Sequence, residues 1–417
     1  MGLRLNREIL VGDVLEKIKE IPDKTIDCVI TSPPYWSLRD YSVEGQWGLE
    51  PDFHQYLAKM GRLMDELRRV LKDTGTCWIN LGDTYSTTSG GMRDMANGKP
   101  NHHGMIDYDK NKGFQSALKI DQSKKSTGLK PKCRIGIPER FYINCIDSGW
   151  IARNNIVWSK NNVMPSSVKD RFTNKYESVF FFVKQQKYYF NLDAVREKSN
   201  TRPTKPFNVR VRDSNTQRFL QGATEQEKLA HNKKGERKWG INAGNTGLVD
   251  HSGNSADNPN GKNPGDLFQI NTRPYKEAHF ATFPPELPTK ILKCGCPDKV
   301  CKKCGFIVEA ITDHKVEHFR ENKRKDKNVI PNSHVERLPS DWTPRHDKVI
   351  GYTDCGCNAG FEPGIVLDCF FGSGTVGEAA EKLGLRWIGI ELNKEYVKLA
   401  KKRLGPYLNQ TRLELEA

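Results

Sequence analysis

The first candidate for chemistry is a rigid turn that follows a short apolar run near the N-terminus. Residues 31–36 of this turn read Thr-Ser-Pro-Pro-Tyr-Trp. Because proline fixes φ and has no amide hydrogen, the carbonyls of Ser32 and Pro33 should be held in one direction as hydrogen-bond acceptors. Tyr35 and Trp36 offer flat faces on which a planar heterocycle could stack. Acceptors for an amine beside a stacking platform favour a nucleobase that has been turned out of its stack.

The second candidate lies far downstream, where a buried strand is predicted to end at Asp368. A turn with Gly372 and Gly374 follows and opens a helix. Glycine permits positive φ and close approach of a ligand, at the strand end where open α/β sheets bind cofactors. The next predicted strand, residues 386–391, ends in Glu391, which is placed to accept the hydroxyls of a ribose. The pattern favours a cofactor that contains a nucleoside.

In this order along the chain, the two segments resemble the permuted, or beta, class of S-adenosylmethionine-dependent amino DNA methyltransferases. The other segments that match this family are residues 12–15, 279–284 and 388–392. The family usually carries Asp-Pro-Phe before the glycines. Cys369 replaces the proline here, and Asp368 and both glycines stay in place.

The resemblance implies an α/β fold: a doubly wound, mostly parallel, seven-stranded sheet of the Rossmann-like methyltransferase type, with helices on both faces. Residues 8–195 would form the catalytic half of the core and residues 265–405 the cofactor-binding half. The residues that the resemblance assigns to the cofactor are Asp13, Thr31, Phe283, Pro284, Asp368, Phe370, Gly372, Gly374, Thr375 and Glu391. Those that it assigns to catalysis are Ser32, Pro33, Pro34 and Tyr35.

The reaction implied by the resemblance is direct transfer of a methyl group to an exocyclic amine. Such an amine is a poor nucleophile because its lone pair is delocalised into the ring. Hydrogen bonds from its protons to Ser32 and to the Pro33 carbonyl would restore that lone pair, and positioning would supply much of the rate. No cysteine nucleophile is needed, and Tyr35 is expected to stack on the base.

The choice of base depends on a single position in the turn. Cytosine N4 and adenine N6 present similar amines, and Ser-Pro-Pro-Tyr resembles the cytosine-N4 enzymes more than Asp-Pro-Pro-Tyr does. We therefore expect a cytosine-N4-specific enzyme that acts on double-stranded DNA, with adenine-N6 methylation as the alternative. RNA methylation, or a non-catalytic zinc-containing DNA-binding protein with a vestigial pocket, are further alternatives that the sequence leaves open.

The composition is strongly basic. The 417 residues include 66 Lys and Arg against 51 Asp and Glu, a net charge of +15. Such an excess favours a polyanionic partner. No stretch of about 18 apolar residues occurs, and the N-terminus lacks an apolar signal segment. We expect no membrane association and a cytoplasmic protein of prokaryotic or phage type, with a cognate restriction endonuclease as a further candidate partner.

Eleven cysteines are present, and six of them lie between positions 294 and 357. Two close pairs, Cys301 with Cys304 and Cys355 with Cys357, are typical of a structural Zn²⁺ site of four thiolates. Alternative ligands are Cys294 and Cys296, or His314 and His318, and unpaired reduced cysteines are the simplest alternative. Four thiolates leave no open position for catalysis.

Several elements should position these sites. A stripe of apolar residues at helical spacing over residues 53–71 predicts a helix that Gly75 ends, and residues 76–80 read as the next strand. A helix over residues 138–147 and strands over 151–158 and 178–183 should follow. The phenylalanines at 180–182 are expected in the core, because a continuous apolar run is typical of a strand covered on both faces.

Three stretches read as insertions. Residues 84–132 are polar with little periodicity and predict a surface segment. Residues 196–264 occupy the place of the family's variable target-recognition region. Residues 294–357 would form a zinc-binding insertion with a basic run, which is either a solvated face or a flap over DNA. The residues expected to contact DNA are Trp36, Arg210, Arg212, Arg218, Arg237 and Lys238.

Overall fold

The computed structural model describes residues 6–86, 127–197, 261–273, 283–313 and 348–409. The chain divides into two compact units. The first comprises residues 1–195, 265–308 and 354–417, and the second comprises residues 196–264 and 309–353. None of the helices within the described ranges is long and apolar enough to cross a membrane.

The first unit is built on an eight-stranded sheet in the order β1-β12-β11-β2-β3-β5-β4-β6. Five of the seven strand pairings are parallel, and β5 is antiparallel to both β3 and β4. The strands are β1 (Glu8–Val11), β2 (Ile26–Thr31), β3 (Leu71–Leu81), β4 (Ile151–Ser159), β5 (Tyr176–Val183), β6 (Leu267–Gln269), β11 (Ile365–Asp368) and β12 (Arg386–Glu391). The mostly parallel sheet is confirmed, with one strand more than expected because the three-residue β6 extends the edge.

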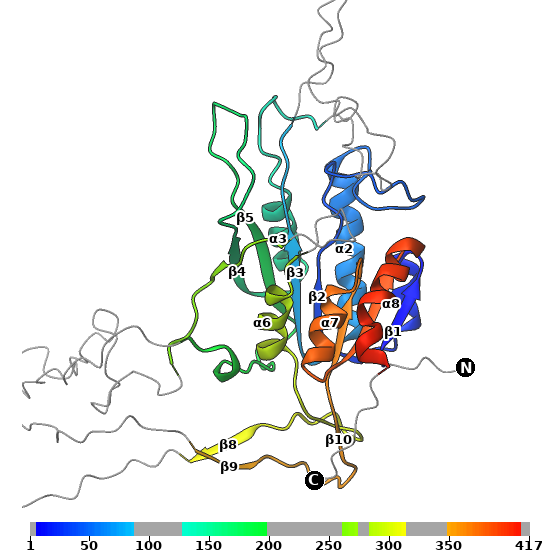
Figure 1. The fold of residues 1–417 in the computed structure, drawn as a ribbon, viewed down its shortest axis with the longest axis vertical. Helices are drawn as coiled ribbons and strands as arrows, with labels where there is room; N and C mark the ends of the chain where they lie inside the picture. The colour runs from blue at the N-terminus through cyan, green and yellow to red at the C-terminus, as the bar shows by residue number, and fades with distance from the viewer. Residues whose placement is uncertain (1–5, 87–126, 198–260, 274–282, 314–347, 410–417) are drawn as a thin grey trace, which may run out of the picture. The chain divides into compact units, whose positions relative to one another are not determined.

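Helices cover both faces of this sheet, as the doubly wound expectation requires (Figure 1). One apolar layer holds side chains of α1 (Val14–Lys17), α2 (Phe53–Val70) and α3 (Ile137–Asp147). The other layer holds those of α6 (Glu286–Gly295), α7 (Thr375–Lys382) and α8 (Lys394–Leu408). Short 3-10 helices occupy Ile18–Glu20 and Asp193–Val195.

The strand sequences explain why both faces are covered. All six residues of β2 are buried. In β5, Phe180 and Phe182 enter the layer of α2 and α3, whereas Phe181 enters the opposite layer and stacks on Trp78. The expected core role of these phenylalanines is confirmed, and the alternation follows from the two-residue period of a strand.

The boundary between α2 and β3 differs from the expectation. Asp52 caps α2 by accepting from the amides of His54 and Gln55, but the helix ends at Val70 and not at Gly75. Gly75 lies inside β3, where a Cβ would sit 2.6 Å from Cδ1 of Leu71. The absence of a side chain therefore serves packing within a strand, and Gly75 is not a helix stop.

Two smaller pieces complete the described structure. In the first unit, β7 (Val300–Cys301) pairs with β10 (Phe361–Glu362) in a separate two-stranded sheet. In the second unit, β8 (Ala310–Asp313) and β9 (Lys348–Tyr352) form an antiparallel pair, and Glu197 bridges Lys262.

Candidate active site

Two motifs that lie far apart in the sequence meet at the carboxyl edge of the sheet. Strand β11 runs parallel to β2, with Val366 opposite Cys28 and Leu367 opposite Val29. At their ends, the Thr31 hydroxyl donates a 2.7 Å hydrogen bond to Oδ1 of Asp368, across a separation of 337 residues. The Phe370 amide donates to the same Asp368 oxygen at 3.1 Å. The Ser-Pro-Pro-Tyr turn and the glycine turn are therefore fixed beside each other by buried contacts.

Ser32 is held through Asn80, a residue that the sequence reading missed. The Ser32 hydroxyl lies 3.2 Å from Oδ1 of Asn80, to which it donates. Asn80 Nδ2 in turn donates to the carbonyl of Ser178 at 3.1 Å and to Glu177 at 3.3 Å, which fixes the orientation of the amide. With its hydrogen directed to Asn80, the Ser32 oxygen keeps lone pairs that can accept from an external N–H.

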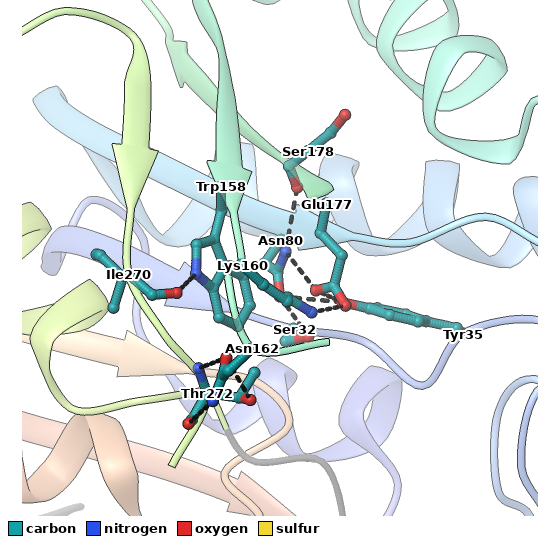
Figure 2. Close-up of polar contacts among 10 residues, drawn as sticks. All are labelled: Ser32, Tyr35, Asn80, Trp158, Lys160, Asn162, Glu177, Ser178, Ile270 and Thr272. Atoms are coloured by element: carbon teal, nitrogen blue, oxygen red, sulfur yellow. Dashed lines mark hydrogen bonds and ion pairs between the residues drawn. The ribbon is translucent and has the colours of Figure 1, made fainter. Parts of the chain in front are cut away.

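Tyr35 is held by its hydroxyl, whose contacts Figure 2 shows, and by its ring. The hydroxyl donates to Oε2 of Glu177 at 2.7 Å, and Lys160 pairs with the other Glu177 oxygen. Burial, followed by the charge of Glu177, raises the pKa of Tyr35 well above its usual value. The ring lies against Gly82, where a Cβ would come within 2.5 Å of Cε2 of Tyr35. The ring is therefore held in one orientation at the edge of the site.

Trp36 does not offer a face to DNA, and this expectation is wrong. Its side chain is only 2% exposed, packs edge-on against Phe53, and donates from Nε1 to the carbonyl of Glu50 at 3.0 Å. The turn that contains the two prolines places Trp36 in the apolar layer that also holds α2, and not on the surface. The Pro34 carbonyl accepts from the Tyr56 hydroxyl at 2.9 Å, whereas the Pro33 carbonyl has no partner among the described residues.

The glycine turn is tied to Glu391 at the end of β12. The amides of Gly372 and Asn393 each donate to one oxygen of the Glu391 carboxylate at 2.7 Å. Gly372 and Gly374 have φ of +53° and +80°, which favour glycine. Burial raises the pKa of Glu391, and the hydrogen bonds from the Asn393 and Gly372 amides oppose this rise.

Asp368 is the most perturbed acid of the site. It is 2% exposed, and burial raises its pKa to about 7, although the hydrogen bond from Thr31 acts in the opposite direction. Burial therefore disfavours the charged form of this carboxyl.

A cavity lies beside these turns, at the carboxyl ends of four parallel strands. Its wall is formed by residues that follow β1, β2, β11 and β12, together with the loop between β2 and α2. The lining residues are Gly12, Asp13, Val14, Pro34, Tyr41, Val43, Gln46, Trp47, Cys369, Phe370, Leu392 and Asn393. This is the place where an open α/β sheet binds a nucleotide-like ligand.

The predicted cofactor residues fall into three groups. Asp13 and Phe370 line the cavity, and Asp368, Gly372, Gly374 and Glu391 belong to the adjoining strand ends and turn. Thr31 is fully buried and holds Asp368, while Thr375 accepts from Arg403 at 2.7 Å. Phe283 and Pro284 do not line the cavity; Phe283 packs against the layer of α6 and α7.

Some residues of this site were not predicted. Asn80 and Glu177 are polar residues at the ends of apolar strands, which is a signal that the sequence carried. Gly377 completes a Gly-x-Gly-x-x-Gly spacing with Gly372 and Gly374, and a Cβ on it would lie 2.7 Å from the ring of Phe371. The third glycine thus permits close packing of α7 on the sheet.

The four predicted cysteines come together in the first unit. The Sγ atoms of Cys301, Cys304, Cys355 and Cys357 all lie within 4.8 Å of one another. A tetrahedral Zn²⁺ with Zn–S bonds of 2.3 Å would place them about 3.8 Å apart, so this donor set fits the ion. Backbone amides of Cys304 and Lys303 donate to the Cys301 sulfur and lower the pKa of this thiol to about 6.

The alternative ligands are placed elsewhere or lie outside the described residues. Cys294 and Cys296 are buried in the apolar layer of α6, and the Cys294 thiol contacts the carbonyl of Ile291 at 3.3 Å. His314 and His318 lie outside the described residues. The same holds for the five predicted DNA contacts Arg210, Arg212, Arg218, Arg237 and Lys238.

Comparison with known proteins shows the family to which this chain is related. The N6_N4_Mtase family model, described as DNA methylase, matches residues 26–301 and 317–402. Type II methyltransferase M.XycI of Xanthomonas campestris pv. cyanopsidis is 30% identical over 393 residues, 94% of this chain and 86% of that protein. Type II methyltransferase M.Cfr9I of Citrobacter freundii is 30% identical over 403 residues, 96% of this chain and 89% of that protein.

Among solved structures, the PvuII DNA methyltransferase (cytosine-N4-specific) aligns with 95% of this chain and 86% of its own, at 16% identity and a TM-score of 0.48.

Proposed function

Since the chain belongs to the N6_N4_Mtase family of DNA methylases, we propose that it transfers a methyl group from S-adenosylmethionine to the N4 amine of a cytosine in double-stranded DNA. One observation carries the proposal. The 2.7 Å hydrogen bond from Thr31 to Asp368 holds the base-binding turn against the cofactor turn. Two reactants bound to these turns would lie in contact, and such positioning is worth several kcal/mol of barrier.

The amine would be handled by Ser32 and Pro33. Because the Ser32 hydrogen is directed to Asn80, its oxygen can accept one N–H of the amine. The Pro33 carbonyl, without a partner among the described residues, can accept the other. Both bonds become stronger as the nitrogen turns tetrahedral, so they stabilise the transition state more than the bound base.

Tyr35 would stack on the extruded base. Its ring is fixed between Gly82 and the hydroxyl contact with Glu177, so little rotamer freedom is lost when a base arrives. Stacking of a base on an aromatic side chain is worth about 1–3 kcal/mol. This is comparable to the few kcal/mol that unstacking of one base costs.

The position and the lining of the cavity at the strand ends suit an adenosine moiety. Trp47 and Phe370 give it apolar walls, and Asp13 supplies a carboxylate. Each oxygen of Glu391 accepts one amide, and a carboxylate has about four acceptor sites, so both ribose hydroxyls could still be bound. When bound, S-adenosylmethionine supplies an electrophilic methyl group on a sulfonium centre.

Cytosine is favoured over adenine by the Ser-Pro-Pro-Tyr form of the turn. In this enzyme, residues 8–195 would form the catalytic half and residues 265–405 the cofactor half. Residues 196–264 would form the target-recognition region. A cytoplasmic DNA substrate and a cognate restriction endonuclease remain predictions that go with it.

The cysteine cluster would hold one structural Zn²⁺. The support is the donor set itself, since four sulfur atoms within 4.8 Å match a closed tetrahedral site. Gly305 and Gly356, with φ of +72° and +70°, give the two cysteine loops their tight turns. A closed site leaves no position for substrate, so the ion would hold the loops of residues 301–304 and 355–357 together and take no part in the reaction.

The test is methyl transfer by the purified protein from labelled S-adenosylmethionine to duplex DNA. Ser32→Ala should lower turnover more than DNA affinity, by about tenfold or more, because its hydrogen bond is worth about 1–1.5 kcal/mol or more in the transition state. Thr25→Ala serves as the control. It removes an exposed hydroxyl directly before the first residue of β2, at the end of the strand away from the site. Label in RNA but not in DNA would contradict the proposal, and full turnover of Ser32→Ala would remove Ser32 from the mechanism.

A further inference from the structure

The loop between β4 and β5, residues 160–175, emerges directly beside the candidate active site. Because β5 runs antiparallel to β3, with Ser178 opposite Leu81, its first residues lie at the carboxyl edge of the sheet. Figure 1 shows the loop projecting beyond the ends of these strands. At the base of the loop, Lys160 pairs with Glu177, which accepts from the Tyr35 hydroxyl. The loop is therefore anchored to the residue proposed to stack on the base.

The outer part of this loop is apolar and basic at the same time. Phe172 is 96% exposed and Met164 is 88% exposed, the largest values among the exposed apolar side chains of the described residues. Of the five ionisable residues from 160 to 175, four are basic. Neither Lys169 nor Lys175 forms an ion pair within the described ranges. Exposed apolar side chains are unfavourable in water. Beside cations they suit DNA, whose phosphates are charged and whose bases form an apolar stack.

The backbone behind Phe172 is held in place. The Arg171 guanidinium lies 4.1 Å from the centre of the Tyr85 ring, and the Tyr85 hydroxyl donates to Asn174 at 3.3 Å. Asp170 pairs with Lys132 at 2.6 Å. Phe172 is thus presented to solvent by fixed neighbours on both sides.

We propose that this loop is a DNA-binding arm, in which Phe172 enters the base stack where the target base has left it. Lys169 and Lys175 would bind the flanking phosphates. The inference rests on the proposed function, because an extruded base is what creates the gap. Apolar side chains are known to insert between base steps. Stacking of an aromatic ring on a neighbouring base is worth about 1–3 kcal/mol, which would offset part of the cost of extruding the target base. Charge complementarity favours DNA as the occupant over a second copy of this basic chain.

The target site is first identified by sequencing modified bases in DNA from cells that express the wild-type protein. The first test then compares two duplexes that both carry this site. In one duplex the target base is paired, and in the other it faces an abasic position. Phe172→Ala should lower kcat/KM about tenfold to a hundredfold on the paired duplex, since flipping costs a few kcal/mol. On the abasic duplex the loss should be below about threefold, because that base is already unpaired.

Two variants control this comparison. Phe172→Trp should restore most activity on the paired duplex, because it keeps a flat apolar wedge. Ile143→Ala removes an exposed apolar side chain from α3, 55% exposed, and should change neither duplex. The proposal of a DNA-binding arm would be overturned if Phe172→Ala lost kcat/KM equally on both duplexes or on neither. A change in its sedimentation without a change in methylation would overturn it as well.

The second test measures binding to a fixed 30-base-pair duplex at several salt concentrations and needs no methylation. Lys169→Gln with Lys175→Gln should reduce the slope of log K against log salt by about two, near 0.9 for each phosphate contact. Lys19→Gln, in the segment that leads into β2, should leave it unchanged. If the wild-type protein methylates no DNA, the proposed function fails, and the arm is then decided by this slope alone; an unchanged slope would overturn it.

Discussion

The candidate active site and the cysteine cluster belong to the same unit but are held in different ways. The active site lies on strands that are buried on both faces, and its key contact joins residues 337 positions apart. The cysteine cluster lies on the two-residue strand β7 and on turns, and its partner strand β10 is equally short. The sheet positions the first site without any ligand, whereas the second depends on the four sulfur atoms themselves.

The two sites should therefore respond differently to substitution. A substitution at the sheet edge should alter the local geometry of the site and leave the fold intact. Loss of one thiolate should instead unfold a segment, because short strands bury too little apolar surface to offset their conformational entropy.

The largest expected effect is removal of the metal. The apparent binding energy of structural Zn²⁺ is about 10–16 kcal/mol, and it would be lost with a chelator or with Cys301→Ser. Hydrogen exchange should then accelerate at the amides of Cys301, Lys302 and Gly305, which are bonded within this segment. Amides of β2 should keep their protection. Cys133→Ser, at an exposed cysteine outside the cluster, should retain the metal. Purified, reduced protein without zinc would contradict the comparison.

The next effect is on cofactor affinity. Glu391→Ala should weaken binding of S-adenosylmethionine by about 1.5–3 kcal/mol, the value of hydrogen bonds to a charged group. S-adenosylhomocysteine lacks the sulfonium charge but keeps the ribose, so calorimetry should show the same loss for both. A loss confined to the charged ligand would mean that Glu391 acts on the sulfonium and not on the ribose.

A similar or smaller effect should follow when one methyl group is added beside the Tyr35 ring. Gly82→Ala would place a Cβ 2.5 Å from the Tyr35 ring, and overpacking of this kind costs about 1–3 kcal/mol. We expect lower turnover with unchanged affinity for the cofactor, because the cavity is lined by other residues. Gly61→Ala, at a helical glycine with open space around it, is the matched control. Wild-type turnover of Gly82→Ala would show that the position of Tyr35 is not critical.

A further effect concerns pH. Burial raises the pKa of Asp368 from 3.8 to about 7, so between these values the folded state binds more protons than the unfolded state. This group should therefore reduce stability as pH rises from about 4 to 7, by at most about 1.4 kcal/mol per pH unit. Asp368→Asn removes the titration, so its advantage over the wild type in urea unfolding should be larger at pH 8 than at pH 5. An equal difference at both pH values would contradict the raised pKa.

Many of the helices and strands that carry the site could be predicted from the sequence. The expected bounds of β12 agree with the structure, and α3 begins one residue before the expected start. Continuous apolar runs predicted β2 and β5, and the cysteine spacing predicted a cluster that the structure assembles. These features are local, since each depends on a period or spacing within a short window.

What the sequence could not show depends on register and on side-chain direction. Asn80 and Glu177 meet only because β3 and β5 pair antiparallel in one particular register. Trp36 adjoins Tyr35 in sequence, yet its ring faces the core because the prolines set the course of the turn. Gly75 follows a helical stripe and therefore predicts a helix stop, although the Leu71 side chain requires a glycine at this position inside β3.

In the proposed function, Ser32 and Pro33 present a cytosine amine for methylation. The most direct test is mass spectrometry of the nucleosides from duplex DNA after incubation with the protein and labelled S-adenosylmethionine. We predict labelled N4-methylcytosine, whose rate of formation falls at least about tenfold with Ser32→Ala and falls strongly with Tyr35→Ala. Labelled N6-methyladenine alone would contradict the choice of base, and 5-methylcytosine would contradict the mechanism, because ring-carbon methylation requires a nucleophile that this turn does not contain.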